Sequence, residues 1–176
     1  MFCMHLHALK PLKIGPITLD FPVVQAALSG YSDTAMRVIA RRLGAPYTLC
    51  EVMLDYFILQ VKERKKTSHL MSVADEEHPV GGQLMGAEPE QFGPAAVKLV
   101  ERGFDVIDIN FGCPVKKVLG RCRGGFHLSQ PDVALEIVSR VRDAVPDQIP
   151  VTVKMRLGME DKPERRAPCF EIFDGA

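Results

Sequence analysis

The sequence predicts an α/β protein that forms part of a (β/α)8 TIM barrel, with about five of the barrel's eight strands present. Short apolar runs alternate with segments of helical periodicity, which is the pattern of parallel βα units. No G-x-G-x-x-G motif follows the first run, which argues against an open dinucleotide-binding sheet. Polar or reactive residues stand at the ends of the runs, as at the active-site rim of a barrel. They are Ser29, Gln83, Asn110, Cys113 and Lys154.

The first two βα units are predicted in the first third of the chain. Residues 22–28 form a short apolar run that is typical of a strand, and Ser32 or Asp33 would cap the helix that follows. The second strand is predicted over residues 47–53. Residues 55–66 should then form a helix, whose basic end suits the negative end of the helix dipole.

Three further strands are predicted, each bounded by proline or glycine. A helix after the third strand begins at Pro89 or Pro94, or kinks at the second proline. The next helix begins near Pro131 and ends before Pro146, and residues 170–176 are typical of the beginning of another helix. The three strands cover residues 79–85, 105–111 and 150–157.

The composition is that of an ordinary soluble domain. Of the 176 residues, 47% are hydrophobic and 25% are charged, and the formal net charge is zero. No global basic field therefore argues for nucleic acid. An RNA partner would need local basic clusters, although such clusters are more often solvated surface. The two candidate clusters are Lys62–Lys66 and the group Lys116, Lys117, Arg121 and Arg123.

The cysteine content favours a reducing, cytoplasmic location. The chain has five cysteines and no C-x-x-C motif, which argues against a disulfide framework. No apolar run approaches the ~18 residues that a membrane span needs, and residues 1–10 lack the features of a signal peptide. Cys3, His5 and His7 alternate near the terminus, but no familiar ligand spacing occurs, so no metal site is expected.

Cys113 is the first candidate for chemistry, because it follows a predicted strand and precedes two cations. An unperturbed thiol has a pKa of ~8.5, so it can serve as a general acid near neutral pH. Asn110 offers a donor and an acceptor, and Gly112 permits a ligand to approach the backbone closely. The alternative is a small buried cysteine that only ends the strand.

Two other side chains suggest an anionic or heterocyclic ligand. Lys154 lies within a predicted strand, where its charge is costly unless an anion meets it; the alternative is a lysine on an exposed edge. The amide of Gln83 is suited to contact a heterocycle edge, or it marks the surface end of a strand. Gly124-Gly125 could form a phosphate-binding turn or simply a loop.

Together these residues resemble the tRNA-dihydrouridine synthases, a family of flavin enzymes. The resemblance runs from about Leu12 to Arg156, and the segment Asn-x-Gly-Cys-Pro-x-Lys-Lys is its most specific part. The motifs that carry it are Ala26-Ala-Leu-Ser-Gly-Tyr-Ser-Asp33, Gly82-Gln83-Leu-Met-Gly86, Asp108-Ile-Asn-Phe-Gly-Cys-Pro-Val-Lys-Lys117 and Val151-Thr-Val-Lys-Met-Arg156.

The resemblance implies an FMN-dependent reduction of the C5–C6 double bond of uridine in tRNA, with NADPH as the reductant of the flavin. It implies that Cys113 donates the proton to C5. The residues it assigns to the cofactor are Ala27, Gln83 and Lys154. Those it assigns to the substrate are Asn110 at the strand end, and Lys116 and Lys117, which would meet RNA phosphates.

The chain departs from the family pattern in two segments. Ala27-Leu28 stands where the family has Pro-Met, and Phe126-His127 stands where small residues are common. By resemblance, residues 1–11 are an N-terminal extension and residues 12–176 are the N-terminal portion of the FMN-binding barrel domain. We expect the later barrel strands and the C-terminal helical tRNA-binding domain of the family to be absent.

Two alternatives remain open at this stage. One is another flavin-dependent barrel oxidoreductase of the dihydroorotate dehydrogenase type, which also has an Asn-x-x-Cys-Pro strand end. The pair Lys116-Lys117 favours the tRNA enzyme, because a small pyrimidine acid needs no such cationic flank. The other is an inactive remnant whose incomplete sheet has open edges; on its own, the chain would then bind FMN poorly.

Overall fold

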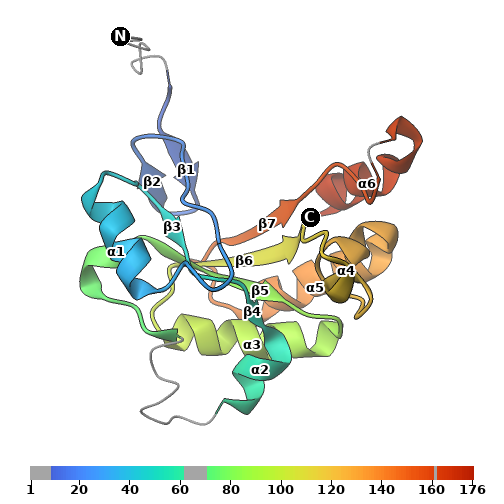
Figure 1. Cartoon of the computed structure of the whole chain (residues 1–176), viewed down its shortest axis with the longest axis horizontal. Coiled ribbons are helices and arrows are strands. Elements are labelled where there is room, and N and C mark those ends of the chain that lie inside the picture. The colour runs from blue at the N-terminus through green and yellow to red at the C-terminus, as the bar shows by residue number, and fades with distance from the viewer. Residues whose placement is uncertain (1–8, 62–70, 161) are drawn as a thin grey trace.

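The computed structural model describes residues 9–61, 71–160 and 162–176 and shows a curled parallel sheet beside a small hairpin (Figure 1). The sheet order is β3-β5-β6-β7, and β4 also pairs with β5. The strands are β1 (Leu12–Ile14), β2 (Ile17–Leu19), β3 (Thr48–Leu49), β4 (Met53–Leu54), β5 (Val80–Met85), β6 (Val106–Phe111) and β7 (Val151–Met155).

Helices follow the strands in the alternation predicted from the sequence. The α-helices are α1 (Thr34–Arg42), α2 (Asp55–Gln60), α3 (Pro89–Glu101), α4 (Lys116–Leu119), α5 (Pro131–Ala144) and α6 (Ala167–Gly175). The short 3-10 helices in the described part of the chain are η3 (Asp75–Glu77), η4 (Gly124–Ser129) and η5 (Pro163–Arg165). Within the described ranges, none of these helices has the length and apolar character needed to cross a membrane.

The prediction of a first strand over residues 22–28 was wrong in extent. Only Gln25 forms a parallel bridge, with Thr48, because its N–H donates to Tyr47 O at 3.0 Å and its O accepts from Leu49 N at 3.0 Å. Its place beside β3 is nevertheless the place expected of a first strand. A proline at position 22 lacks the N–H that would extend the ladder.

The predicted second strand is broken into β3 and β4. The break lies at Glu51, whose N–H donates to Ser32 O at 3.2 Å instead of joining the ladder to β5. The helix after it, α2, ends at Gln60, and its predicted continuation through the basic residues 62–66 lies outside the described residues.

Two predicted helix starts are settled by the structure. Asp33 is the N-cap of α1, and its carboxylate accepts a hydrogen bond from Met36 N at 2.9 Å. Helix α3 begins at Pro89 and continues through Pro94, so the first of the two possible starts is confirmed.

The two faces of the sheet carry different side chains. A Cβ on Gly82 would meet Leu99 and Phe104, which belong to the apolar core beneath α3. A Cβ on Gly81 would instead meet Tyr47 and Leu49 on the opposite, inner face. Figure 1 shows α2, α3 and α5 on one side of the sheet, with the β1–β2 hairpin rising on the other.

The register of the inner face determines where the polar residues lie. Gln83 is level with Asp108, and Asp108 is level with Thr152 on the next strand. Asn110 and Lys154 form the following row, one step closer to the carboxyl ends of the strands. Residues from three separate βα units therefore meet on one surface.

Candidate active site

Asp108 is the centre of a buried hydrogen-bond chain across β5, β6 and β7. Its carboxylate accepts from Gln83 Nε2 at 2.6 Å and from Thr152 Oγ1 at 2.6 Å. Asp108 is 5% exposed and Gln83 is 1% exposed, so both groups depend on these partners rather than on water. Burial raises the pKa of Asp108, while its hydrogen bonds from Thr152 and Gln83 and the charge of Lys154 act in the opposite direction.

Asn110 extends this chain to the loop that carries the thiol. Its Nδ2 donates to Gln83 Oε1 at 2.8 Å. Its Oδ1 accepts from the backbone N–H groups of Gly112 at 3.1 Å and Cys113 at 3.0 Å. An asparagine that bonds the backbone two or three residues ahead stabilises a turn, so the chain leaves β6 in a fixed direction.

Cys113 is half-buried beside this chain and lies outside the apolar core clusters. Its carbonyl accepts from Gly125 N at 3.0 Å, and a Cβ on Gly124 would lie 2.9 Å from Cys113 Cβ. The two glycines therefore pack closely against the thiol-bearing residue. Of the two alternatives for Cys113, a cysteine buried in the core is excluded.

Lys154 is exposed, in contrast to the burial that its strand position suggested. Among the described residues β7 pairs with β6 on one side only, so it forms an edge of the sheet and the alternative of an exposed edge lysine is the one observed. The ammonium group therefore keeps its hydration and needs no buried anion. Its position level with Asn110 still places it on the site's inner face.

The remaining predicted residues lie around this chain rather than in it. Ala27 is half-buried and packs against the inner apolar cluster of Leu19 and Tyr47. Lys116 and Lys117 open helix α4 and are exposed, just after the thiol loop. Within the described residues, no hydrogen bond joins Ala27 or the two lysines to Gln83 or Asn110.

His127, which the sequence marked only as a departure from the family pattern, is buried next to the site. Its Nε2 lies 3.0 Å from Gly86 O, and its ring lies 5.1 Å from the ring of Phe111. A carbonyl only accepts, so Nε2 carries a proton and donates this hydrogen bond. Burial lowers the pKa of His127, and the hydrogen bond to Gly86 O acts in the opposite direction. The histidine thus packs between Gly86 and Phe111, beside the carboxyl end of β6.

A second polar cluster lies at the carboxyl end of β4. Asp55 is 1% exposed, and its carboxylate accepts from Tyr56 N at 2.6 Å. The guanidinium of Arg123 lies 5.0 Å from the centre of the Tyr56 ring. Burial raises the pKa of Asp55, and the charge of Arg123 partly opposes this shift. The cluster links the end of β4 to the loop after α4.

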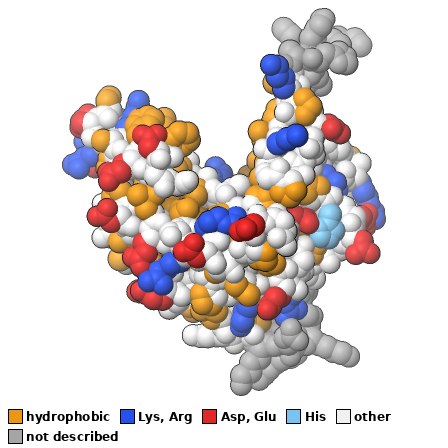
Figure 2. All heavy atoms as spheres, turned by 180° about the vertical axis from the view of Figure 1, so that it is seen from behind, with side chains coloured by type: hydrophobic (Ala, Val, Ile, Leu, Met, Phe, Trp, Pro, Cys, Tyr) orange, Lys and Arg blue, Asp and Glu red, His pale blue; other side chains and the backbone are white. Residues whose placement is uncertain are grey.

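An open cavity of about 730 Å³ runs between the hairpin and the edge of β7. In Figure 2 it is the hollow between two arms, and hydrophobic side chains gather along its walls. Its polar lining includes Asp108, Thr152 and Lys154 from the sheet and Arg142 from α5. The volume lies within the range of ligand-binding clefts, ~300–1,000 Å³.

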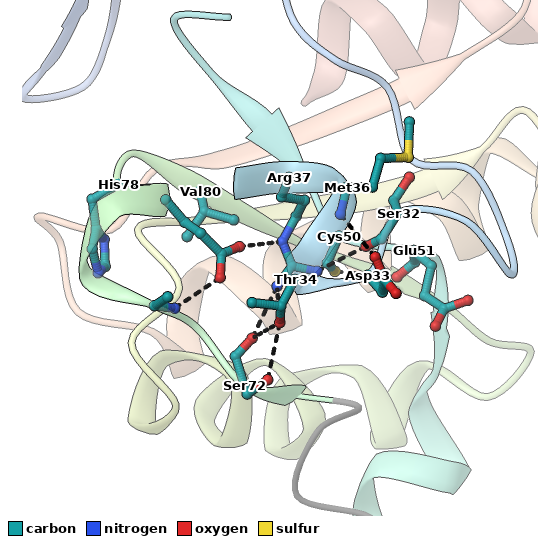
Figure 3. A network of polar contacts seen from close by, with 12 residues as sticks. Ser32, Asp33, Thr34, Met36, Arg37, Cys50, Glu51, Ser72, His78 and Val80 are labelled. Atoms are coloured by element: carbon teal, nitrogen blue, oxygen red, sulfur yellow. Dashed lines mark hydrogen bonds and ion pairs between the residues drawn. The ribbon is translucent and has the colours of Figure 1, made fainter. Parts of the chain in front are cut away.

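A separate buried network holds α1 to η3 and to the residues just before η3 (Figure 3). Arg37, 3% exposed, forms an ion pair with Glu77, 0% exposed, with 2.5 Å between Nε and Oε2. The guanidinium also donates to Ser32 O at 2.8 Å and to Ser72 O at 2.9 Å. Glu77 in turn accepts from Ala74 N at 2.8 Å. The network fixes helix α1 relative to residues 72–77.

The fold is shared with a solved structure of histamine dehydrogenase from Rhizobium sp. 4-9, with a TM-score of 0.68 and 17% sequence identity. The match covers 94% of this chain and 34% of that one, and at this identity it concerns the fold alone. The curled parallel sheet, with polar side chains at the carboxyl ends of its strands, is a half-barrel of the (β/α)8 class, as the sequence predicted.

Sequence comparison identifies the family. The family model described as dihydrouridine synthase (Dus) matches residues 24–175. A probable tRNA-dihydrouridine synthase 1 of Synechocystis sp. is 38% identical over 152 residues, which cover 86% of this chain and 42% of that protein. The tRNA-dihydrouridine synthase B of Xanthomonas campestris pv. campestris is 35% identical over 149 residues, covering 85% and 44%. The chain belongs to the dihydrouridine synthase family and spans less than half the length of these curated relatives.

Proposed function

We propose that this chain carries part of the site of a tRNA-dihydrouridine synthase, which reduces the C5–C6 double bond of uridine in cytoplasmic tRNA. The observation that carries the proposal is the hydrogen-bond chain from Gln83 through Asn110 to the backbone of Cys113. It joins Gln83, from a supporting motif, to Asn110 and Cys113, which belong to the most specific segment of the resemblance. Residues 12–176 would be the N-terminal portion of the FMN-binding barrel, with residues 1–11 as an extension.

The residues on the inner face fit a flavin. A planar heterocycle edge needs amide donors and acceptors beside a cation, and the buried amide of Gln83 lies near the row of Asn110 and Lys154. Gln83 and Lys154 would hold the ring, and Ala27 would border it from the neighbouring loop. FMN, when bound, supplies the hydride for uridine C6 and takes its electrons from NADPH.

Cys113 has the chemistry and the setting of a proton donor to uridine C5. Its loop is held by Asn110 Oδ1, so the thiol belongs to a rigid strand end rather than a free loop. Asn110 uses one side-chain N–H for Gln83 and has a second for a substrate carbonyl. Lys116 and Lys117 are exposed beside the thiol loop, where they would meet phosphates of the RNA.

The test measures dihydrouridine formed in unmodified tRNA by the complete protein that contains this chain, with NADPH and FMN. Cys113→Ala should abolish turnover and leave the visible absorption of bound flavin unchanged. Cys122→Ala is the matched control, because it removes an exposed thiol from the same loop region. Turnover that survives Cys113→Ala would remove the thiol from the proposed role.

The same assay separates the two other candidate functions. Dihydroorotate offered in place of tRNA should give no flavin reduction; rapid reduction would favour an enzyme of the dihydroorotate dehydrogenase type. The isolated 176-residue chain is expected to bind FMN poorly and to show little activity. A complete protein that is equally inactive and colourless would favour a remnant without catalysis.

A further inference from the structure

The hydrogen-bond chain on the inner face has a direction that is set at both of its ends. At one end, the N–H groups of Gly112 and Cys113 only donate, so Asn110 must turn its oxygen toward them. Asn110 then presents Nδ2 to Gln83, which must accept with Oε1. Gln83 has only its nitrogen left for the other end.

At that other end lies Asp108, whose ionised carboxylate can accept hydrogen bonds but cannot donate them. Its Oδ2 receives Gln83 Nε2, and its Oδ1 receives the hydroxyl of Thr152. A hydrogen-bond donor at position 108 would face the donating nitrogen of Gln83. The Gln83 amide would then turn over to present its oxygen to position 108. A flipped Gln83 would in turn face Asn110 with a donor against a donor.

We propose that Asp108 is a positioning residue whose buried carboxylate orients the amides of Gln83 and Asn110, and through them the loop that holds Cys113. Among the described residues its carboxylate bonds Gln83 and Thr152 rather than the thiol, and it also lines the open cavity. The inference deepens the proposed function and rests on it for any consequence in catalysis. The orientation of the chain, however, is a property of the protein without cofactor or substrate.

An exchange of acid and amide tests the direction of the chain. Gln83→Glu sets a second carboxyl group against Asp108, and the readouts are taken at alkaline pH so that the pair is ionised and shares no proton that could replace the lost amide donor. In the double variant Gln83→Glu/Asp108→Asn, the amide introduced at position 108 donates to the carboxylate introduced at position 83, which still accepts from Asn110. The chain is complete again with the acid and the amide interchanged.

The readouts are hydrogen exchange of the backbone amides of Gly112 and Cys113, and the alkylation rate of Cys113 relative to the exposed Cys122. In Gln83→Glu, amide protection should fall about tenfold, which corresponds to ~1.4 kcal/mol, and Cys113 should be alkylated faster. The double variant should restore both to within about threefold of the parent protein.

The matched control makes the same exchange on the surface, with Gln130→Glu and Asp132→Asn, because both of these side chains are exposed. It should change neither readout. A double variant as disturbed as Gln83→Glu alone, whether by lost protection or lost folding, would overturn the proposal, as would an undisturbed Gln83→Glu. If the double variant restores amide protection and the alkylation rate but has no turnover, the result counts against the proposed function and not against the positioning role of Asp108.

Discussion

Replacing Arg37 with methionine should destabilise the fold strongly, because it leaves Glu77 charged and buried. Arg37 and Glu77 are 3% and 0% exposed, so neither charge is screened by water. Removing one partner of such a pair typically costs ~3–5 kcal/mol. The guanidinium also satisfies the carbonyls of Ser32 and Ser72, which favours the upper part of that range. For a domain stable by ~5–15 kcal/mol, this is a large fraction.

Urea unfolding followed by circular dichroism measures the effect as a lower midpoint at unchanged slope. The double variant Arg37→Met/Glu77→Leu should recover most of the loss, since no unpaired charge is left buried. Arg42→Met breaks the exposed pair with Glu76, whose side chains are 67% and 49% exposed, and should leave the midpoint unchanged. A loss below ~1 kcal/mol for Arg37→Met would refute the reasoning.

Three more predictions concern the surroundings of the site. Burial lowers the pKa of His127, so below about pH 6.5 the histidine binds a proton in the unfolded chain but not in the folded one. The free energy of unfolding should therefore fall with decreasing pH by up to ~1.4 kcal/mol per pH unit. His127→Gln should reduce this slope, as measured by urea unfolding at several pH values. Gly86→Ala puts a methyl into the space of Asp55 Oδ2 and should cost ~1–3 kcal/mol, with a smaller cost when Asp55→Ala is also present. Gly81→Ala would overlap the Tyr47 hydroxyl and should lower the melting temperature more than an exposed Gly44→Ala that is corrected for its backbone strain.

The sequence predicts those helices and strands whose apolar pattern lies within their own residues. Helices α3 and α5 and strands β5 and β6 carry long apolar patterns, and the structure confirms each of them. The first predicted strand was wrong in extent, and the second is broken because a distant group competes for its backbone. The N–H of Glu51 donates to Ser32 O rather than to β5, and the sequence around neither residue predicts that contact.

The β1–β2 hairpin was missed although the sequence contains its signal. Gly15-Pro16 lies between Ile14 and Ile17, which pair directly, and Gly15 has a φ of 55°. A two-residue loop with glycine first is typical of a tight hairpin turn. Each of the two strands has only 3 residues, which is too short for an alternating apolar pattern to stand out.

Within the candidate site, the sequence identified residues but not their partners. Gln83 and Asn110 stood out as polar side chains within or at the end of apolar strands, and the structure joins them directly. Asp108 was seen only as part of a motif, because its role depends on the register between β5, β6 and β7. Register arises from the packing of the whole sheet, so the level pairing of Gln83 with Asp108 cannot be inferred from either strand alone.

The lysine in β7 affects handling of the protein as well as its chemistry. Among the described residues, no strand pairs with the side of β7 that faces away from β6, and a charge within such an edge strand discourages pairing with a foreign strand. Lys154→Met would therefore remove a solubilising charge together with the proposed flavin contact. Low colour in that variant is informative only when light scattering shows that the sample has stayed dispersed.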